Sequence, residues 1–147
     1  MRGLLLGLFV LSILHARVRA DDFVVIGDSL SCGGFGNALV KGLTAKGSHV
    51  ALFCAVDSAP ANWLDGITPK GRECMTMTSA NPIAQLCDGT GQIPKLSELL
   101  AEHPGSRVVL ALGTNSILSA YVDRSFSALA RIARNYGCSC DWGGRRT

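Results

Sequence analysis

The stretch Phe23-Val24-Val25-Ile26-Gly27-Asp28-Ser29-Leu30 decides the fold of this chain. Its first four residues form a short apolar run, which predicts a buried strand. Gly27 follows at once, and glycine allows the backbone to turn sharply. Ser29 is therefore expected where a strand passes into a helix, and the backbone N–H groups at a helix start favour negative charge. A hydroxyl in that position is suited to nucleophilic attack and to formation of an oxyanion.

Residues 1–20 are predicted to be a secretory signal peptide, and residues 21–147 a single domain. The leader has a basic start, an apolar core and the cleavage signal Val18-Arg19-Ala20. A membrane anchor is the rival interpretation, but the apolar core is shorter than a spanning helix. Asp21, not cysteine, follows the cleavage point, which argues against a lipoprotein. A secreted or periplasmic protein without a stable membrane span is expected.

Removal of the leader leaves a mature chain without net charge. The full chain has 14 Lys+Arg and 11 Asp+Glu residues. Three of the basic residues and none of the acidic ones lie in the leader, so 11 of each sign remain. Only Arg145 and Arg146 cluster along the sequence, so no nucleic-acid partner is predicted.

Six cysteines in a secreted chain predict disulfides, and they are Cys32, Cys54, Cys74, Cys87, Cys138 and Cys140. Six cysteines allow fifteen pairings, so the connectivity stays open. Cys74 and Cys87 bracket a loop-like stretch and are the best candidate pair, worth roughly 3 kcal/mol. Buried free thiols are the alternative. A zinc site is disfavoured because Cys138 and Cys140 are only one residue apart, and no metal is predicted.

Apolar periodicity predicts alternating strands and helices in the mature chain. Strands are expected at residues 23–26, 49–55 and 108–112, with a fourth starting near Cys138. Helices are expected at residues 36–46, 94–103 and 122–135. The segment 56–92 is rich in Gly, Pro, Ser, Thr and Asn, which predicts a long irregular loop tied down by cysteines. The alternation predicts an α/β fold with a doubly wound parallel sheet.

Two of the expected strands end in polar, turn-forming segments. The first ends in Gly27-Asp28-Ser29 and the third in Gly113-Thr114-Asn115. Ligands bind at the carboxyl ends of parallel strands, so Ser29 and Asn115 are expected at one shared edge. Each segment also has a simpler interpretation. The first matches an Asx turn at a helix start, and Asn115 alone matches a helix cap.

The combination of Gly27-Asp28-Ser29-Leu30 with Gly113-Thr114-Asn115 resembles the SGNH (GDSL) hydrolases, which are secreted esterases and acyl hydrolases. The resemblance covers residues 23–142, and Trp63-Leu64-Asp65-Gly66 looks like one of the family's bacterial branches. It implies a flavodoxin-like, three-layer α/β/α sheet with Ser29 as the nucleophile. The side chain of Asn115 would donate to the oxyanion, and Gly113 would line the same site. Asp28 would stabilise the turn and would not be the triad acid.

The sequence departs from the family pattern in two places. Asp57 stands about where the family has a glycine whose N–H binds the oxyanion. The C-terminal Asp-x-x-His, which supplies the general base, is absent. His49 and His103 precede expected strands, so both are predicted at the edge opposite Ser29. We therefore expect a C-terminally incomplete domain that lacks its last strand and helix.

Two functions are compatible with these residues. The first is an esterase that cleaves a carboxylic ester of a small molecule or glycan through an acyl-Ser29 intermediate, without a metal or organic cofactor. The second is a non-catalytic remnant, or a carbohydrate- or ester-binding module, that keeps the pocket without the base. Ser31 stands where the Gly-x-Ser-x-Gly elbow of α/β-hydrolases needs glycine. Gly34-Phe35-Gly36 matches a dinucleotide fingerprint only weakly, because Leu39 replaces its third glycine.

Overall fold

The computed structural model describes residues 22–112 and 122–136. The chain order of the elements is β1 (Phe23–Gly27), α1 (Gly34–Thr44), β2 (Val50–Ala55), α2 (Pro60–Asp65), β3 (Cys74–Thr78), β4 (Gln85–Leu86), the 3-10 turn η1 (Cys87–Gly89), α3 (Leu96–Glu102), β5 (Arg107–Ala111) and α4 (Val122–Asn135). None of these helices is long and apolar enough to cross a membrane. The proposed leader and the strand expected from Cys138 lie outside the described residues.

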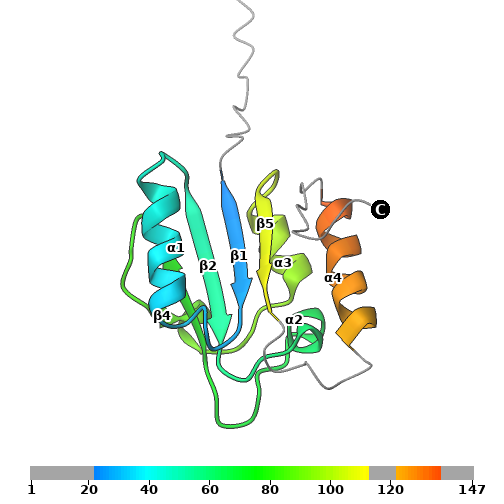
Figure 1. The fold of residues 1–147 in the computed structure, drawn as a ribbon. Coiled ribbons are helices and arrows are strands. Elements are labelled where there is room, and N and C mark those ends of the chain that lie inside the picture. Colours follow the sequence, from blue (N-terminus) through cyan, green and yellow to red (C-terminus); the bar gives the residue numbers. More distant parts are fainter. Residues whose placement is uncertain (1–21, 113–121, 137–147) are drawn as a thin grey trace, which may run out of the picture.

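The strands form a mixed sheet in the order β4-β3-β2-β1-β5, with β1 between β2 and β5 (Figure 1). β1 is parallel to both of these neighbours, and Gly27 stands opposite Cys54 on one side and Ala111 on the other. β3 is antiparallel to β2, and β4 is antiparallel to β3. Gly27, Cys54 and Ala111 thus mark the carboxyl edge of the three parallel strands.

The predicted flavodoxin-like, doubly wound parallel sheet is wrong, because two antiparallel strands extend the sheet beyond β2. They come from segment 56–92, which was expected to be irregular and instead contains α2, β3 and β4. The physical reason is visible in Cys74-Met75-Thr76-Met77-Thr78, where apolar and polar residues alternate as in a half-buried strand. Strong turn composition around this short segment masked the alternation.

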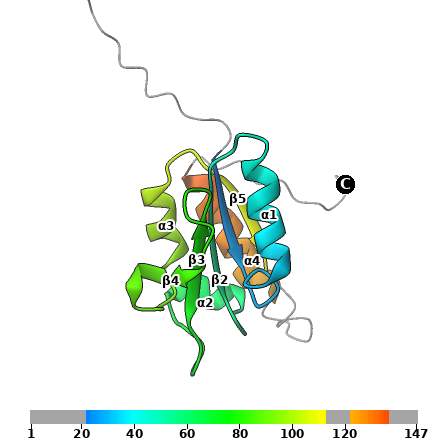
Figure 2. The same ribbon diagram turned by 90° about the vertical axis from the view of Figure 1, so that its left-hand side faces the viewer.

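Helices cover both faces of the sheet, and Figure 2 shows α1 and α3 on opposite sides of it. On one face, Val40 of α1 packs with Val25 and Leu52. On the other face, side chains of α2, α3 and α4 pack against Val24 and Ile26; they include Trp63, Leu96, Leu100 and Leu129. β1 is covered on both sides, which explains why its sequence is continuously apolar.

The helices predicted at residues 36–46 and 122–135 are present as α1 and α4. The helix expected to open at Pro94 begins two residues later as α3. Glu98 sets this start, because its Oε2 accepts a hydrogen bond from the backbone N–H of Lys95 at 3.1 Å. Such a contact satisfies a donor that the first turn of a helix leaves free.

Two disulfides join the four described cysteines. The predicted pair Cys74–Cys87 is confirmed and links β3 to η1. The second, Cys32–Cys54, was not foreseen and ties the segment after β1 to the end of β2. Free thiols are thereby excluded at these four positions, and the pairing is typical of an oxidising compartment. Cys138 and Cys140 lie outside the described residues.

Candidate functional site

Asp28 organises the turn between β1 and α1. Its Oδ1 accepts a hydrogen bond from the N–H of Leu30 at 3.1 Å, and its carbonyl accepts one from the N–H of Ser31 at 3.0 Å. The N–H of Asp28 donates to the carbonyl of Ala111 at 3.3 Å, which joins the turn to the end of β5. Asp28 is 1% exposed, so it holds the turn from within, as an Asx turn does.

Ser29 lies in this turn at the carboxyl edge of β1 and is half-buried. Within the described residues, no hydrogen bond involves its hydroxyl. Gly113 and Asn115, the other expected site residues, lie outside the described residues. Leu112, the last described residue before them, lines the same pocket as Asp28. The structure thus places the serine turn beside the end of β5 and leaves the pairing of Ser29 with Asn115 a prediction.

Close packing restricts the turn from the side of α1. A Cβ atom at Gly27 would collide with the side chain of Ser31, and one at Gly36 would collide with the Ser31 carbonyl. Ser31 is fully buried, and its Oγ has no hydrogen-bond partner within the described residues. Glycine is required at both positions because α1 and β1 approach the turn so closely.

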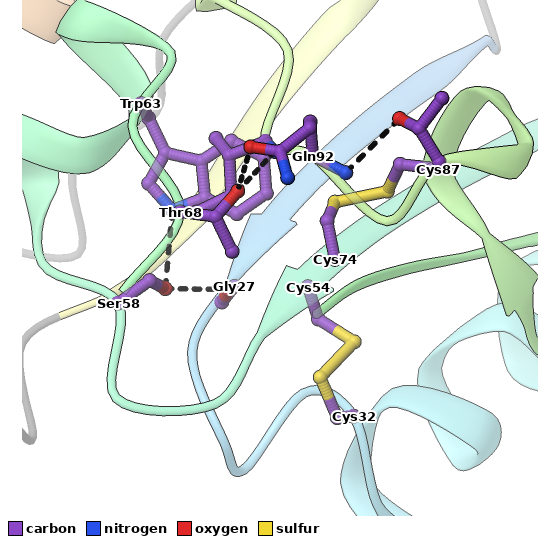
Figure 3. The surroundings of a disulfide bond; sticks show 11 residues. Gly27, Cys32, Cys54, Ser58, Trp63, Thr68, Cys74, Cys87 and Gln92 are labelled. Carbon is purple, nitrogen blue, oxygen red and sulfur yellow. Dashed lines mark hydrogen bonds between the residues drawn. A yellow bond between two sulfur atoms is a disulfide. The ribbon is translucent and has the colours of Figure 1, made fainter. Parts of the chain in front are cut away.

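The Cys32–Cys54 disulfide fastens the far side of the turn (Figure 3). Cys32 is three residues beyond Ser29, and Cys54 stands opposite Gly27 in the β1–β2 register. The two Cα atoms are 5.4 Å apart. Ser29 is therefore held between the end of β1 and a covalent link to β2. Sequence reasoning missed this constraint because spacing along the chain does not reveal which cysteines meet in space.

A buried pair of hydrogen bonds supports the end of β1. Ser58 Oγ donates to the carbonyl of Gly27 at 3.4 Å and accepts from Trp63 Nε1 at 3.2 Å, as Figure 3 shows. Both side chains are fully buried. Trp63 therefore fixes Ser58, and Ser58 fixes the carbonyl that precedes the serine turn. Pro60 at the first helical position is the sequence signal that marks the start of α2.

Asp57, expected at the oxyanion-loop position, has a left-handed backbone with φ of 61°. Its Oδ2 lies 2.6 Å from Nη2 of Arg72, and the Nε–H of Arg72 donates to the same oxygen. The two side chains are 52% and 48% exposed, so this ion pair contributes little to stability. The guanidinium of Arg72 nevertheless balances the charge of the Asp57 carboxylate. An unpaired carboxylate at this position would oppose a developing oxyanion.

A pocket of about 270 Å³ opens next to the serine turn. It is lined by Asp28, Leu30, Ser31, Phe35, Ala111 and Leu112. Leu30 and Phe35, both in this lining, are 59% and 55% exposed, so the pocket presents large apolar side chains to solvent. Mostly apolar walls with a few polar groups are the usual composition of a small-molecule site.

The two described histidines lie at the opposite edge of the sheet, as predicted. His49 directly precedes β2 and His103 directly follows α3. Both line a separate pocket of about 190 Å³ together with Asp22, at the start of β1. The five residues of β1 separate this edge from Ser29, a distance of roughly 13 Å. A general base must approach to about 3 Å or act through one water, so neither histidine reaches Ser29.

The described residues contain no group of His, Cys, Asp or Glu side chains arranged to hold a metal ion. Comparisons with protein families, with characterised proteins and with solved structures find no significant match to this chain. The functional interpretation therefore depends on the geometry around Ser29.

Proposed function

We propose that this chain is a secreted esterase of the SGNH type, with Ser29 as its nucleophile. The observation that carries the proposal is the turn after β1. A buried Asp28 holds the turn that carries Ser29 at the carboxyl edge of parallel strands, and the residues on either side of Ser29, Asp28 and Leu30, line an apolar pocket. Ligands of α/β sheets bind at this edge. The two disulfides are consistent with secretion.

Two further features support this proposal. Asp57 adopts a backbone conformation that favours glycine, and glycine is the residue that the SGNH resemblance implies there. The segment Gly113-Thr114-Asn115 follows β5, which pairs directly with β1. A side-chain amide supplied from that segment would stabilise the transition state by about 3 kcal/mol.

The proposed reaction proceeds in two steps. Ser29 Oγ attacks the ester carbonyl carbon, the bond to the alcohol oxygen breaks, and the hydroxyl proton passes through water to the leaving alcohol. Water then attacks the acyl-Ser29 ester, which releases the acid and restores the hydroxyl. Because neither described histidine reaches Ser29, deprotonation of the hydroxyl is expected to limit the rate.

The position of the histidines also supports a second candidate function. An apolar pocket beside the serine turn, with no described imidazole near Ser29, fits a module that binds an ester or carbohydrate without cleaving it. This alternative predicts saturable ligand binding that is retained in Ser29→Ala.

A fluorophosphonate probe and a chromogenic short-chain ester test the proposal together. We expect slow covalent labelling, located at Ser29 by peptide mass, and ester turnover that is lost in Ser29→Ala. Ser97→Ala, which changes a serine of α3 that is half-buried as Ser29 is, is the matched control and should keep both signals. Turnover that survives Ser29→Ala would eliminate Ser29 as the nucleophile. Ester binding without labelling or turnover would favour the binding module.

A further inference from the structure

The outer face of α4 carries a row of three arginines. Arg124, Arg131 and Arg134 are all exposed, and Ser127 and Ala128 lie between them along the same concave face. Residues three, four and seven apart share one side of a helix. At 1.5 Å per residue the arginine row, meaning these three side chains, extends over about 15 Å.

The opposite face of α4 is committed to the protein core. Leu129 and Ala133 are fully buried and Ala130 is 2% exposed. The helix packs against α2 and α3, and Figure 1 shows it beside both. The rotation of α4 about its axis is therefore fixed, so the arginine row is directed away from the core.

Among the side chains that the structure describes, which do not include that of Asp123, no ion pair neutralises the arginine row. The ion pair between Arg72 and Asp57 does not involve α4. The expected mature chain has equal numbers of basic and acidic residues, so the row is a local excess of charge. Exposed positive groups within about one Debye length, roughly 8–10 Å, repel one another. Arg131 and Arg134 are that close along α4, and a bound anion would relieve their repulsion.

We propose that the arginine row binds a linear anionic polysaccharide through its sulfate or carboxylate groups. A guanidinium group donates two parallel hydrogen bonds to such an oxyanion, which an ammonium group does not. The row contains arginine only, and the small side chains of Ser127 and Ala128 leave space for a chain to pass between Arg124 and Arg131.

Two observations favour a polysaccharide over other polyanions. The disulfides indicate an oxidising compartment, which separates the protein from cytosolic nucleic acids. An anionic membrane would attract each arginine by only about 1 kcal/mol, and the apolar side of α4, whose insertion could add to this, is buried in the core. The inference does not depend on catalysis by Ser29.

Binding of heparin and of polygalacturonate to the full chain tests this proposal, and the two polymers distinguish sulfate from carboxylate recognition. The variant Arg124→Ser/Arg131→Ser/Arg134→Ser removes the row. The control Lys41→Ser/Lys46→Ser/Lys70→Ser removes three exposed lysines and changes the net charge equally. We expect the row variant to lose roughly 10-fold or more in affinity, and its binding to depend less steeply on salt. The affinity of the control variant for both polymers should stay close to that of the unmodified chain.

Three outcomes would overturn the proposal. Equal losses of affinity in the row variant and in the lysine control would mean that only the net charge attracts the polymer. Absence of binding to either polymer by the unmodified chain would exclude the site. Binding to phosphatidylserine vesicles but to neither polymer would identify a membrane surface instead. Circular dichroism of both variants controls for folding, because all six replaced side chains are exposed.

Discussion

Cys54 stands opposite Gly27 in the β1–β2 ladder and is bonded to Cys32, on the far side of the serine turn. The β1–β2 register therefore fixes the start of the turn at Gly27. The disulfide to Cys54, the residue opposite Gly27, fixes the end of the turn at Cys32. The placement of Ser29 therefore depends on the pairing of β1 with β2 as well as on the packing of α1. This relationship makes the disulfide a direct probe of the candidate site.

Replacing both Cys32 and Cys54 by alanine should lower the free energy of unfolding by roughly 3 kcal/mol. It should also lower kcat of ester hydrolysis more than it raises KM, because the nucleophile loses its position. Urea unfolding and steady-state kinetics measure the two effects. The matched variant lacks Cys74 and Cys87, and should lose comparable stability while keeping kcat at temperatures where it stays folded. Equal losses of kcat in both variants would contradict the positioning role.

Gly27→Ala should destabilise the protein by about 1–3 kcal/mol, because the added methyl group overlaps the side chain of Ser31. Thermal or chemical denaturation measures this change. Gly42→Ala is the control, since Gly42 is exposed within α1 and has open space around it. That substitution should stabilise the helix by about 0.5–1 kcal/mol. A Gly27→Ala variant as stable as the unmodified chain would show that Ser31 has room to move.

The contact between Ser58 and Trp63 should show energetic coupling. Ser58→Ala leaves the indole N–H without its oxygen acceptor in a buried site, which should cost about 1–3 kcal/mol. Trp63→Phe removes the donor and most of the same interaction. A double-mutant cycle by denaturant unfolding should therefore give a coupling free energy of roughly 1 kcal/mol. Additive effects of the two substitutions would mean that the hydrogen bond contributes nothing measurable.

Asp57→Gly should be close to neutral in stability. Glycine relieves the cost of a positive φ, while loss of the half-exposed ion pair with Arg72 removes about 0–1 kcal/mol. If Asp57 occupies the oxyanion loop, the same substitution should raise ester turnover, because it removes a carboxylate from that loop. Asp57→Asn removes the charge but keeps the backbone cost, so it separates the two effects. Turnover that neither variant changes would place Asp57 outside the site.

The parts of the fold that sequence patterns predicted are those with a strong local signal. The apolar run 23–26 indicated a buried strand, and the periodicity of residues 122–135 matched α4 at both ends. The positions of His49 and His103 at the far edge followed from their places before strands. Each of these inferences needs only the neighbours of a residue along the chain.

The parts that failed need information from across the sheet. The short strands β3 and β4 gain their stability from pairing with β2 and with each other, and composition alone marked them as loop. The Cys32–Cys54 pair depends on the β1–β2 register. The spacing of Arg124, Arg131 and Arg134 is visible within the predicted helix 122–135, but which face of that helix the core covers is known only from the structure.

The two disulfides close loops that do not overlap along the chain. Cys32 pairs with Cys54 and Cys74 with Cys87, so each described bridge joins two cysteines that are consecutive along the chain. Cys32 and Cys54 can therefore be oxidised to a disulfide before Cys74 is synthesised, without later disulfide exchange. Neither bridge spans residues 55–73. A single proteolytic cut there would let the chain separate into two peptides in denaturant, whereas a cut within 33–53 or 75–86 would leave one covalent molecule.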